Sequence, residues 1–183
     1  RSDVIVAPEL LSQLHEVLSR PEPRYASGTV NITARSAVSR AYARIWRQVP
    51  FMAQCVPGCG VFAVNAAGRG RWGCFPDIIS DDSFVRRHFS PSERHQVDPS
   101  YVWPITAGFP SLVRVRRRQD QGLAELEREF PELIASSDPS APDMMTKLKL
   151  LFTDPIGFVF YSCVAVAVRL PVFRNRTRWE RRR

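Results

Sequence analysis

The most informative stretch of the chain reads FPDIISDDSF, residues 75–84. Its first half, residues 75–79, is apolar and strand-like, and its second half places Asp81 and Asp82 at the start of a helical turn that runs to His88. A Ser or Asp before a helix accepts hydrogen bonds from free backbone N–H groups, so capping explains one acid or both. Ligand sites of α/β sheets also lie where a strand leads into a helix, so the same position suits a functional site.

The two acids predict a division of roles. A carboxylate at such a site can accept the proton of an attacking hydroxyl. Neighbouring residues seldom point the same way, so one acid would cap the helix or hold a hydroxyl while the other acts as the base.

The rest of the chain predicts an α/β protein with a mixed sheet, flanking helices and a helical C-terminal extension. Residues 156–168 form the most apolar run, which is too short for the ~20 residues that a membrane-spanning helix needs, so we expect a buried or interface-lying helix. Helices are expected at 8–19, 36–47 (capped by Ser36), 111–130 and 144–151, strands at 3–6, 25–33 and 96–106, and a glycine turn with a buried strand at 57–64.

Composition fits one globular domain. The chain has 183 residues, of which 44% are hydrophobic and 24% are charged, so a packed core is expected. Fifteen prolines favour a loop-rich α/β or α+β fold over a helical bundle. Cys55 and Cys59 are four residues apart, not three, and no Cys-x-x-Cys or His-x-His partner completes a zinc pattern. The four cysteines predict reduced, mostly buried thiols in a cytoplasmic protein.

The formal net charge of +8 draws much of its excess from arginines clustered in residues 114–118 and 174–183. Arginine forks suit phosphate, so nucleic acid, an anionic membrane and a phosphorylated substrate are all open as partners. Of these three partners, nucleic acid fits the sequence least well, because the four tryptophans are dispersed and no nucleic-acid-binding motif is present. The apolar run and the basic tail would together seat a cytoplasmic protein on the anionic inner face of the plasma membrane.

Several segments resemble the inverting family-two glycosyltransferases of the GT-A fold, in the family's order. Residues 75–84 are similar to the segment that carries the family's acid pair, and GCGVFA at 58–63 resembles the glycine turn and strand before the acceptor site. DVIVAP at 3–8 resembles the end of the Asp-x-Asp strand, and WER at 179–181 resembles a sequence near the C-terminus of some members. On this resemblance, residues 1–135 are the acceptor-side part of a GT-A-like catalytic domain. Residues 136–183 are then a helical, basic, membrane-associated extension.

The resemblance implies transfer of a sugar from a nucleotide-diphospho-sugar to a hydroxyl of a glycan, polysaccharide or lipid-linked acceptor, with inversion. It also implies a divalent cation, Mg²⁺ or Mn²⁺. The residues that it assigns are Asp82 as general base beside Asp81, Gly58 and Gly60 together with Arg117 and Arg118 at the substrate, and Asp3 at the metal.

The chain departs from the family pattern in three places. Arg1 stands where the first acid of the metal motif would be, and the family's nucleotide-binding βαβ units are not in this sequence. The Gln-x-x-Arg-Trp motif of processive members is not reproduced: Val115 and Gln119 replace its Gln and Trp around Arg118, which argues against a processive synthase. The alternatives are a non-catalytic remnant that is inactive alone, or a basic module that binds nucleic acid or an anionic membrane.

Overall fold

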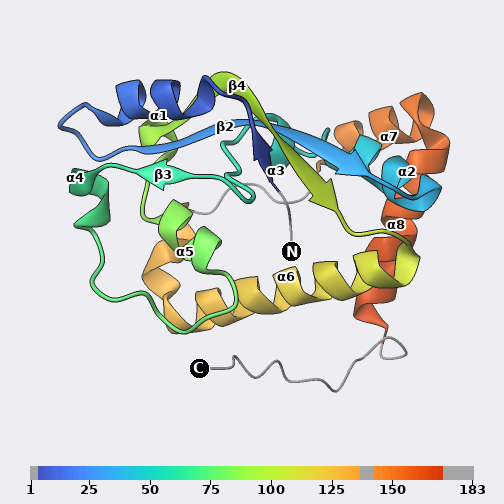
Figure 1. The fold of residues 1–183 in the computed structure, drawn as a ribbon. Coiled ribbons are helices and arrows are strands. Elements are labelled where there is room, and N and C mark those ends of the chain that lie inside the picture. Colours follow the sequence, from blue (N-terminus) through green and yellow to red (C-terminus); the bar gives the residue numbers. More distant parts are fainter. Residues whose placement is uncertain (1–3, 137–141, 171–183) are drawn as a thin grey trace.

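The computed structural model describes residues 4–136 and 142–170 as a mixed α/β protein with a curled four-stranded sheet, flanking helices and a helical C-terminal part (Figure 1). In chain order the elements are β1 (Ile5–Val6), α1 (Leu10–Leu18), β2 (Tyr25–Ala34), α2 (Ala37–Trp46), α3 (Pro50–Ala53), β3 (Ala63–Val64), α4 (Ala66–Arg69), α5 (Asp81–Arg87), the 3₁₀ turn η1 (Pro91–Glu93), β4 (Arg94–Ile105), α6 (Phe109–Glu129), the 3₁₀ turn η2 (Pro131–Ser136), α7 (Met144–Thr153) and α8 (Pro155–Arg169).

The sheet has the strand order β1-β4-β2-β3. Its two long strands, β2 and β4, run parallel from the pair Tyr25–Arg94 to the pair Ala34–Ile105. The short strands β1 and β3 pair antiparallel with β4 and β2 at the two edges. The sheet is therefore mixed, as the sequence predicts.

Helices cover both faces of the sheet (Figure 1). On one face, α1 buries Leu10 and Leu14 against Ala26 and Tyr101, because its leucines repeat at helical spacing. On the other face, α2, α6 and α8 enclose a core around Trp46. A third cluster joins α5 to the C-terminal half of α6. Its buried residues are Tyr25, Trp72, Ile78, Phe84, Val85, Phe89, Leu126 and Leu133.

Two capping residues fix the helices on the second face. Ser36 accepts the N–H of Ser39 at 3.1 Å and caps α2, as predicted. Asp154 caps α8 by accepting the N–H of Gly157 at 2.9 Å. The same carboxylate makes a two-pronged ion pair with Arg44 of α2, at 2.6 and 3.0 Å. One side chain therefore both starts α8 and holds it against α2.

Most of the expected elements are confirmed, and two are wrong. The four helices, the two long strands and a helix over the apolar run 156–168 all form. Residues 75–79 are not strand-like but a loop, because the N–H of Ile79 donates to the Glu125 carboxylate instead of a neighbouring strand. The acid pair therefore does not follow a strand. The buried strand expected within 57–64 shortens to the half-buried edge strand β3.

Two further expectations concern the cysteines and the membrane. All four cysteines lie in the described residues and none forms a disulfide, but Cys74 and Cys163 are exposed, so "mostly buried" is wrong. Within residues 4–136 and 142–170, no helix combines the length and the apolar character that crossing a bilayer requires.

Candidate functional site

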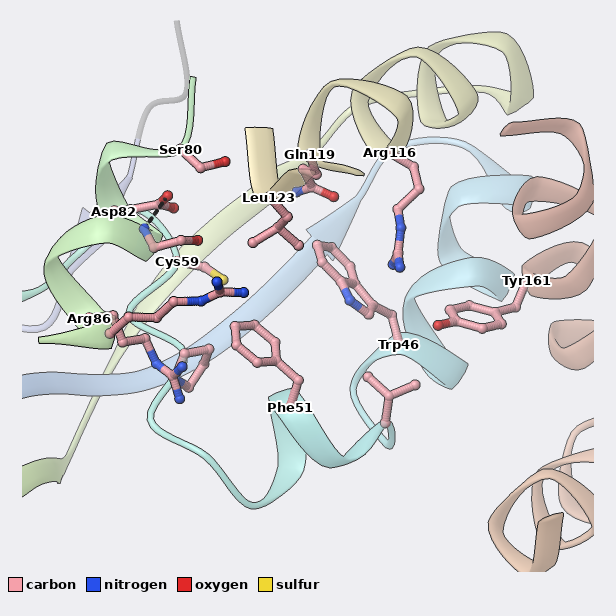
Figure 2. A pocket seen from close by; sticks show the side chains of 14 residues that line it. Trp46, Phe51, Cys59, Ser80, Asp82, Arg86, Arg116, Gln119, Leu123 and Tyr161 are labelled. Atoms are coloured by element: carbon pink, nitrogen blue, oxygen red, sulfur yellow. Dashed lines mark hydrogen bonds between the residues drawn. The ribbon is translucent and has the colours of Figure 1, made fainter. Parts of the chain in front are cut away.

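A pocket of about 160 Å³ opens between α2, α3, α5, α6 and α8 (Figure 2). At about 30 Å³ per water molecule, it has the room of about five waters, roughly one sugar ring. Five separate elements contribute to it, so it forms only in the folded chain. Its lining residues are Trp46, Val49, Phe51, Pro57, Cys59, Ser80, Asp82, Ser83, Arg86, Arg87, Arg116, Gln119, Leu123 and Tyr161.

Helix α5 brings only one of the paired acids to this pocket. Asp82 lines it and Asp81 does not, although both acids are exposed. Each acid accepts a backbone N–H in the first turn: Asp81 from Asp82 at 3.0 Å, and Asp82 from Ser83 at 2.7 Å. Ser80 makes no side-chain cap. Both acids therefore support the start of the helix, and Asp82 in addition faces the pocket.

Helix α6 sets the position of this acid segment. A Cβ atom on Gly122 would collide with Ser80 and lie 3.0 Å from Ile79 Cγ2, so the glycine allows the loop before α5 to lie directly on α6. The N–H of Ile79 donates to Glu125 at 2.9 Å in the next turn of α6. This close packing, and not a strand, holds the N-terminus of α5 at the pocket.

The glycine turn before β3 lies beside the pocket, but neither of its glycines lines it. Gly58 has φ +62° and lies against the Tyr25 hydroxyl, where a Cβ atom would collide. Its neighbours Pro57 and Cys59 line the pocket, and Gly60, with φ +80°, is exposed. Burial, together with the negative charge of Asp82, raises the pKa of the Cys59 thiol to about 12.

Three arginines line the pocket. Arg86 donates to the carbonyl of Val56 at 2.7 Å, and its guanidinium lies 5.0 Å from the centre of the Phe51 ring. Arg87 pairs with Glu127 of α6 at 3.1 Å. Arg86 and Arg87 are both buried, with 5% and 7% of their surface exposed. The pocket therefore carries buried positive charge beside its one carboxylate.

The third arginine, Arg116, comes from α6. It makes an ion pair with Asp120 at 3.0 Å and a hydrogen bond with Tyr42, whose pKa burial raises to about 12. Figure 2 shows Asp82 and Arg116 on opposite sides of the pocket, with Gln119 and Leu123 between them.

Aromatic rings form the wall below Arg116. The ring of Trp46 lies 5.3 Å from that of Trp103, and Tyr42 stacks on Tyr161 of α8 with ring centres 5.2 Å apart. Trp46 and Tyr161 both line the pocket. A flat apolar wall beside charged and hydroxyl groups suits the faces of a sugar or another polar ring.

The structure does not bring the other predicted arginines into this pocket. Arg117 donates to the carbonyls of Ala167, Val168 and Leu170 at 3.1, 2.8 and 2.8 Å, so it caps the C-terminus of α8. Arg118 is exposed and lines neither this pocket nor the shallower one beside Arg117. Asp3 and the basic tail from residue 171 lie outside the described residues.

Sequence reasoning missed Arg86, Arg87, Arg116 and Trp46. A usable signal existed for α5: residues four apart on a helix share a face, so Asp82 with Arg86 and Ser83 with Arg87 point the same way. For Trp46, which reaches the pocket from α2, the sequence carries no comparable signal.

The pocket residues do not fit a divalent cation. Among the described residues, no group of three or more His, Cys, Asp or Glu side chains comes together as metal ligands. Asp82 is the one carboxylate in the lining, and three arginines repel a cation from the same space. The arrangement favours an anionic or hydroxylated ligand instead.

Comparisons of the chain with protein-family models, with curated proteins and with solved structures found no match. The resemblance to family-two glycosyltransferases therefore depends on the residues of this sequence alone.

Proposed function

We propose that this chain is the acceptor-side part of an inverting glycosyltransferase that uses a nucleotide-diphospho-sugar, with Asp82 as the general base. The single observation that carries the proposal is the placement of Asp82. Of the two paired acids, it alone lines a pocket with the room of one sugar ring.

The surroundings of Asp82 support a proton-accepting role. The Ser83 N–H bonds one carboxylate oxygen at 2.7 Å, which fixes the side chain at the pocket. The tight packing of Gly122 on the segment before α5 holds this helix in place. A base that is held within reach of its proton needs little reorganisation during the reaction.

The chemistry is a single in-line displacement. The acceptor hydroxyl gives its proton to Asp82 as its oxygen forms a bond to C1 of the donor sugar. The bond from C1 to the diphosphate oxygen breaks, and the nucleoside diphosphate leaves with the electron pair. Attack from the face opposite the leaving group inverts the configuration at C1. No step is assigned to a divalent cation, because the described pocket residues do not suit one.

Sugar transfer by the full-length protein tests this function. A panel of labelled nucleotide-diphospho-sugars is offered with hydroxyl acceptors, and the variants Asp82→Asn and Asp81→Asn are compared with the unaltered protein. Removal of a general base costs about 10²–10⁴-fold in rate, so Asp82→Asn should lose nearly all transfer. Asp81→Asn should stay within a few-fold. Near-normal turnover by Asp82→Asn would remove Asp82 from this role, and absence of transfer from every donor would overturn the function.

A membrane-binding surface is a second candidate, because α7 and α8 expose many large apolar side chains. Phe152 is 81% exposed, Met145 73% and Ile156 65%, and all three lie within one stretch of α7 and α8. Lys147 and Lys149 are exposed on the same helix α7. An apolar surface with lysines beside it suits the interface of an anionic leaflet.

Sedimentation with lipid vesicles tests this second candidate. The protein should bind vesicles that contain phosphatidylglycerol more tightly than vesicles of phosphatidylcholine alone. Phe152→Glu should weaken binding several-fold. Leu11→Glu, at a similarly exposed leucine on α1, is the matched control and should bind as before. Equal weakening by both variants would contradict a surface specific to α7 and α8.

A further inference from the structure

The pocket's charges call for an anionic partner. Its lining contains Arg86, Arg87 and Arg116 but only one carboxylate, that of Asp82. The acids that pair with Arg87 and Arg116 do not line the pocket. They are Glu127 and Asp120, whose side chains are 47% and 45% exposed against 9% and 33% for their arginine partners. These acids therefore pair with the arginines from the solvent side, outside the pocket.

Arg87 has a buried N–H donor that its ion pair leaves unsatisfied. Its Nη2 bonds Glu127, but its buried Nη1 has no hydrogen-bond partner in the part of the chain that the structure describes. Leaving a buried charged donor unsatisfied is costly, and such groups are normally paired. This unsatisfied donor adds to the positive charge on the α5 side of the pocket.

The pocket's size connects Arg116 to Asp82. Figure 2 places Arg116 across the pocket from Asp82, and the volume between them is about 160 Å³. A ligand that fills this space with one ring reaches both ends. The group at Arg116 and the hydroxyl at Asp82 then belong to the same molecule.

The direction of the displacement decides whether the molecule in this pocket is the donor or the acceptor. In an in-line reaction, the attacking oxygen and the leaving diphosphate lie on opposite sides of C1. The base contacts the attacking hydroxyl, so the small space that continues from the base holds the rest of the acceptor.

We propose that the acceptor carries an anionic group, a phosphate or a carboxylate, which Arg116 binds while its hydroxyl meets Asp82 and its ring lies against Trp46. This inference rests on the proposed function and names the class of acceptor for the same site. Arg116 is well suited because its planar fork bonds two oxygens of a phosphate or carboxylate at once.

Calorimetric binding to the full-length protein tests the inference without using transfer. The probes are glucose, glucuronate and glucose 1-phosphate, so that the two anionic arms distinguish a carboxylate from a phosphate. At least one anionic probe should bind ten-fold or more tightly than glucose. Arg116→Gln should reduce that preference at least ten-fold and leave glucose binding within two-fold. Arg116→Lys, which keeps the charge, should retain part of the preference, and Arg118→Gln is the matched control.

Two results would overturn the inference: glucose binding as tightly as both anionic probes, or equal losses in Arg116→Gln and Arg118→Gln. The variant Asp82→Asn separates this inference from the proposed function. It should keep the anion preference while it loses transfer. Transfer to neutral acceptors without any anion preference would reject the inference alone, whereas anion binding without transfer from any donor would reject the function alone.

Discussion

Two faces of helix α6 use neighbouring arginines in different ways. Arg116 lines the pocket together with Gln119 and Leu123, at spacings of three and seven residues. Arg117 turns to the end of α8 and donates to three of its carbonyls. Successive helical residues are about 100° apart, so adjacent positions in a run of arginines meet different surroundings. The helical phase of an arginine, and not its membership of a cluster, decides whether it serves a ligand or the fold.

The first prediction concerns the pocket and the thiol of Cys59 that lines it. With a pKa of about 12, Cys59 should have a thiolate fraction roughly three thousandfold smaller than that of an ordinary thiol with a pKa near 8.5. Iodoacetamide at pH 8 should therefore alkylate exposed Cys74 far faster than Cys59. Mass spectrometry of timed samples measures both rates. Similar rates would mean that the surroundings of Cys59 are open and polar.

The contact between α6 and the acid segment gives the next largest effect. Gly122→Ala should destabilise the protein by roughly 2–3 kcal/mol, because the added methyl collides with Ser80 and Ile79. The same substitution should also reduce sugar transfer, since it displaces α5. Gly73→Ala, where an added Cβ meets nothing within 4 Å, is the control and should change stability by less than about 0.5 kcal/mol. Urea unfolding measures both, and equal effects would contradict the tight packing.

The structural role of the other face of α6 is tested by replacing Arg117. Arg117→Ala should cost about 1.5 kcal/mol of stability, because the charged donor to the last carbonyls of α8 is lost. It should leave anion binding at the pocket unchanged. Arg118→Ala, at the exposed neighbour, should be near neutral. Loss of pocket binding in Arg117→Ala, with stability intact, would reverse the roles assigned to the two faces.

The ion pair between Arg71 and Glu93, which does not involve α6, should give the smallest effect on stability. Hydrogen bonds from Arg71 and Ser90 lower the pKa of Glu93 to about 2, from an ordinary 4.5. A lowered pKa means that the stabilisation is fully present above pH 4.5 and is lost as the pH falls to 2. At pH 7, Glu93→Gln should cost less than about 1 kcal/mol, as for other surface pairs. Melting temperatures should converge between variant and unaltered protein towards pH 2; a constant gap would contradict the lowered pKa.

The sequence predicted the regular elements well, because their signals are local. The spacing of Leu10 and Leu14, and the Ser36 cap, depend on residues within a turn or two of one another. The loop at 75–79 was misread as a strand because its apolar side chains match that pattern. Its actual partners, Gly122 and Glu125, lie more than 40 residues away. No local pattern encodes such a contact.

The candidate site was predictable only in part, for the same reason. Asp82 could be singled out because paired acids at a helix start are visible in the sequence. The choice between Arg116 and Arg117 depends on where α8 packs on α6, which the sequence does not reveal. Trp46 and Tyr161 join the pocket through the tertiary arrangement of α2 and α8.

The wall that Tyr161 contributes also has a consequence for biosynthesis. Tyr161 leaves the ribosome about 80 residues after Asp82, roughly 4–16 s later at 5–20 residues per second. Until then α8 cannot dock, and the Arg44–Asp154 ion pair, whose partners are 110 residues apart in the chain, cannot form. The nascent protein therefore carries its acid pair for several seconds beside an incomplete pocket, with the aromatic core on α2 uncovered. Binding of a substrate before translation passes this point is not expected, and chaperones have a defined interval in which to act.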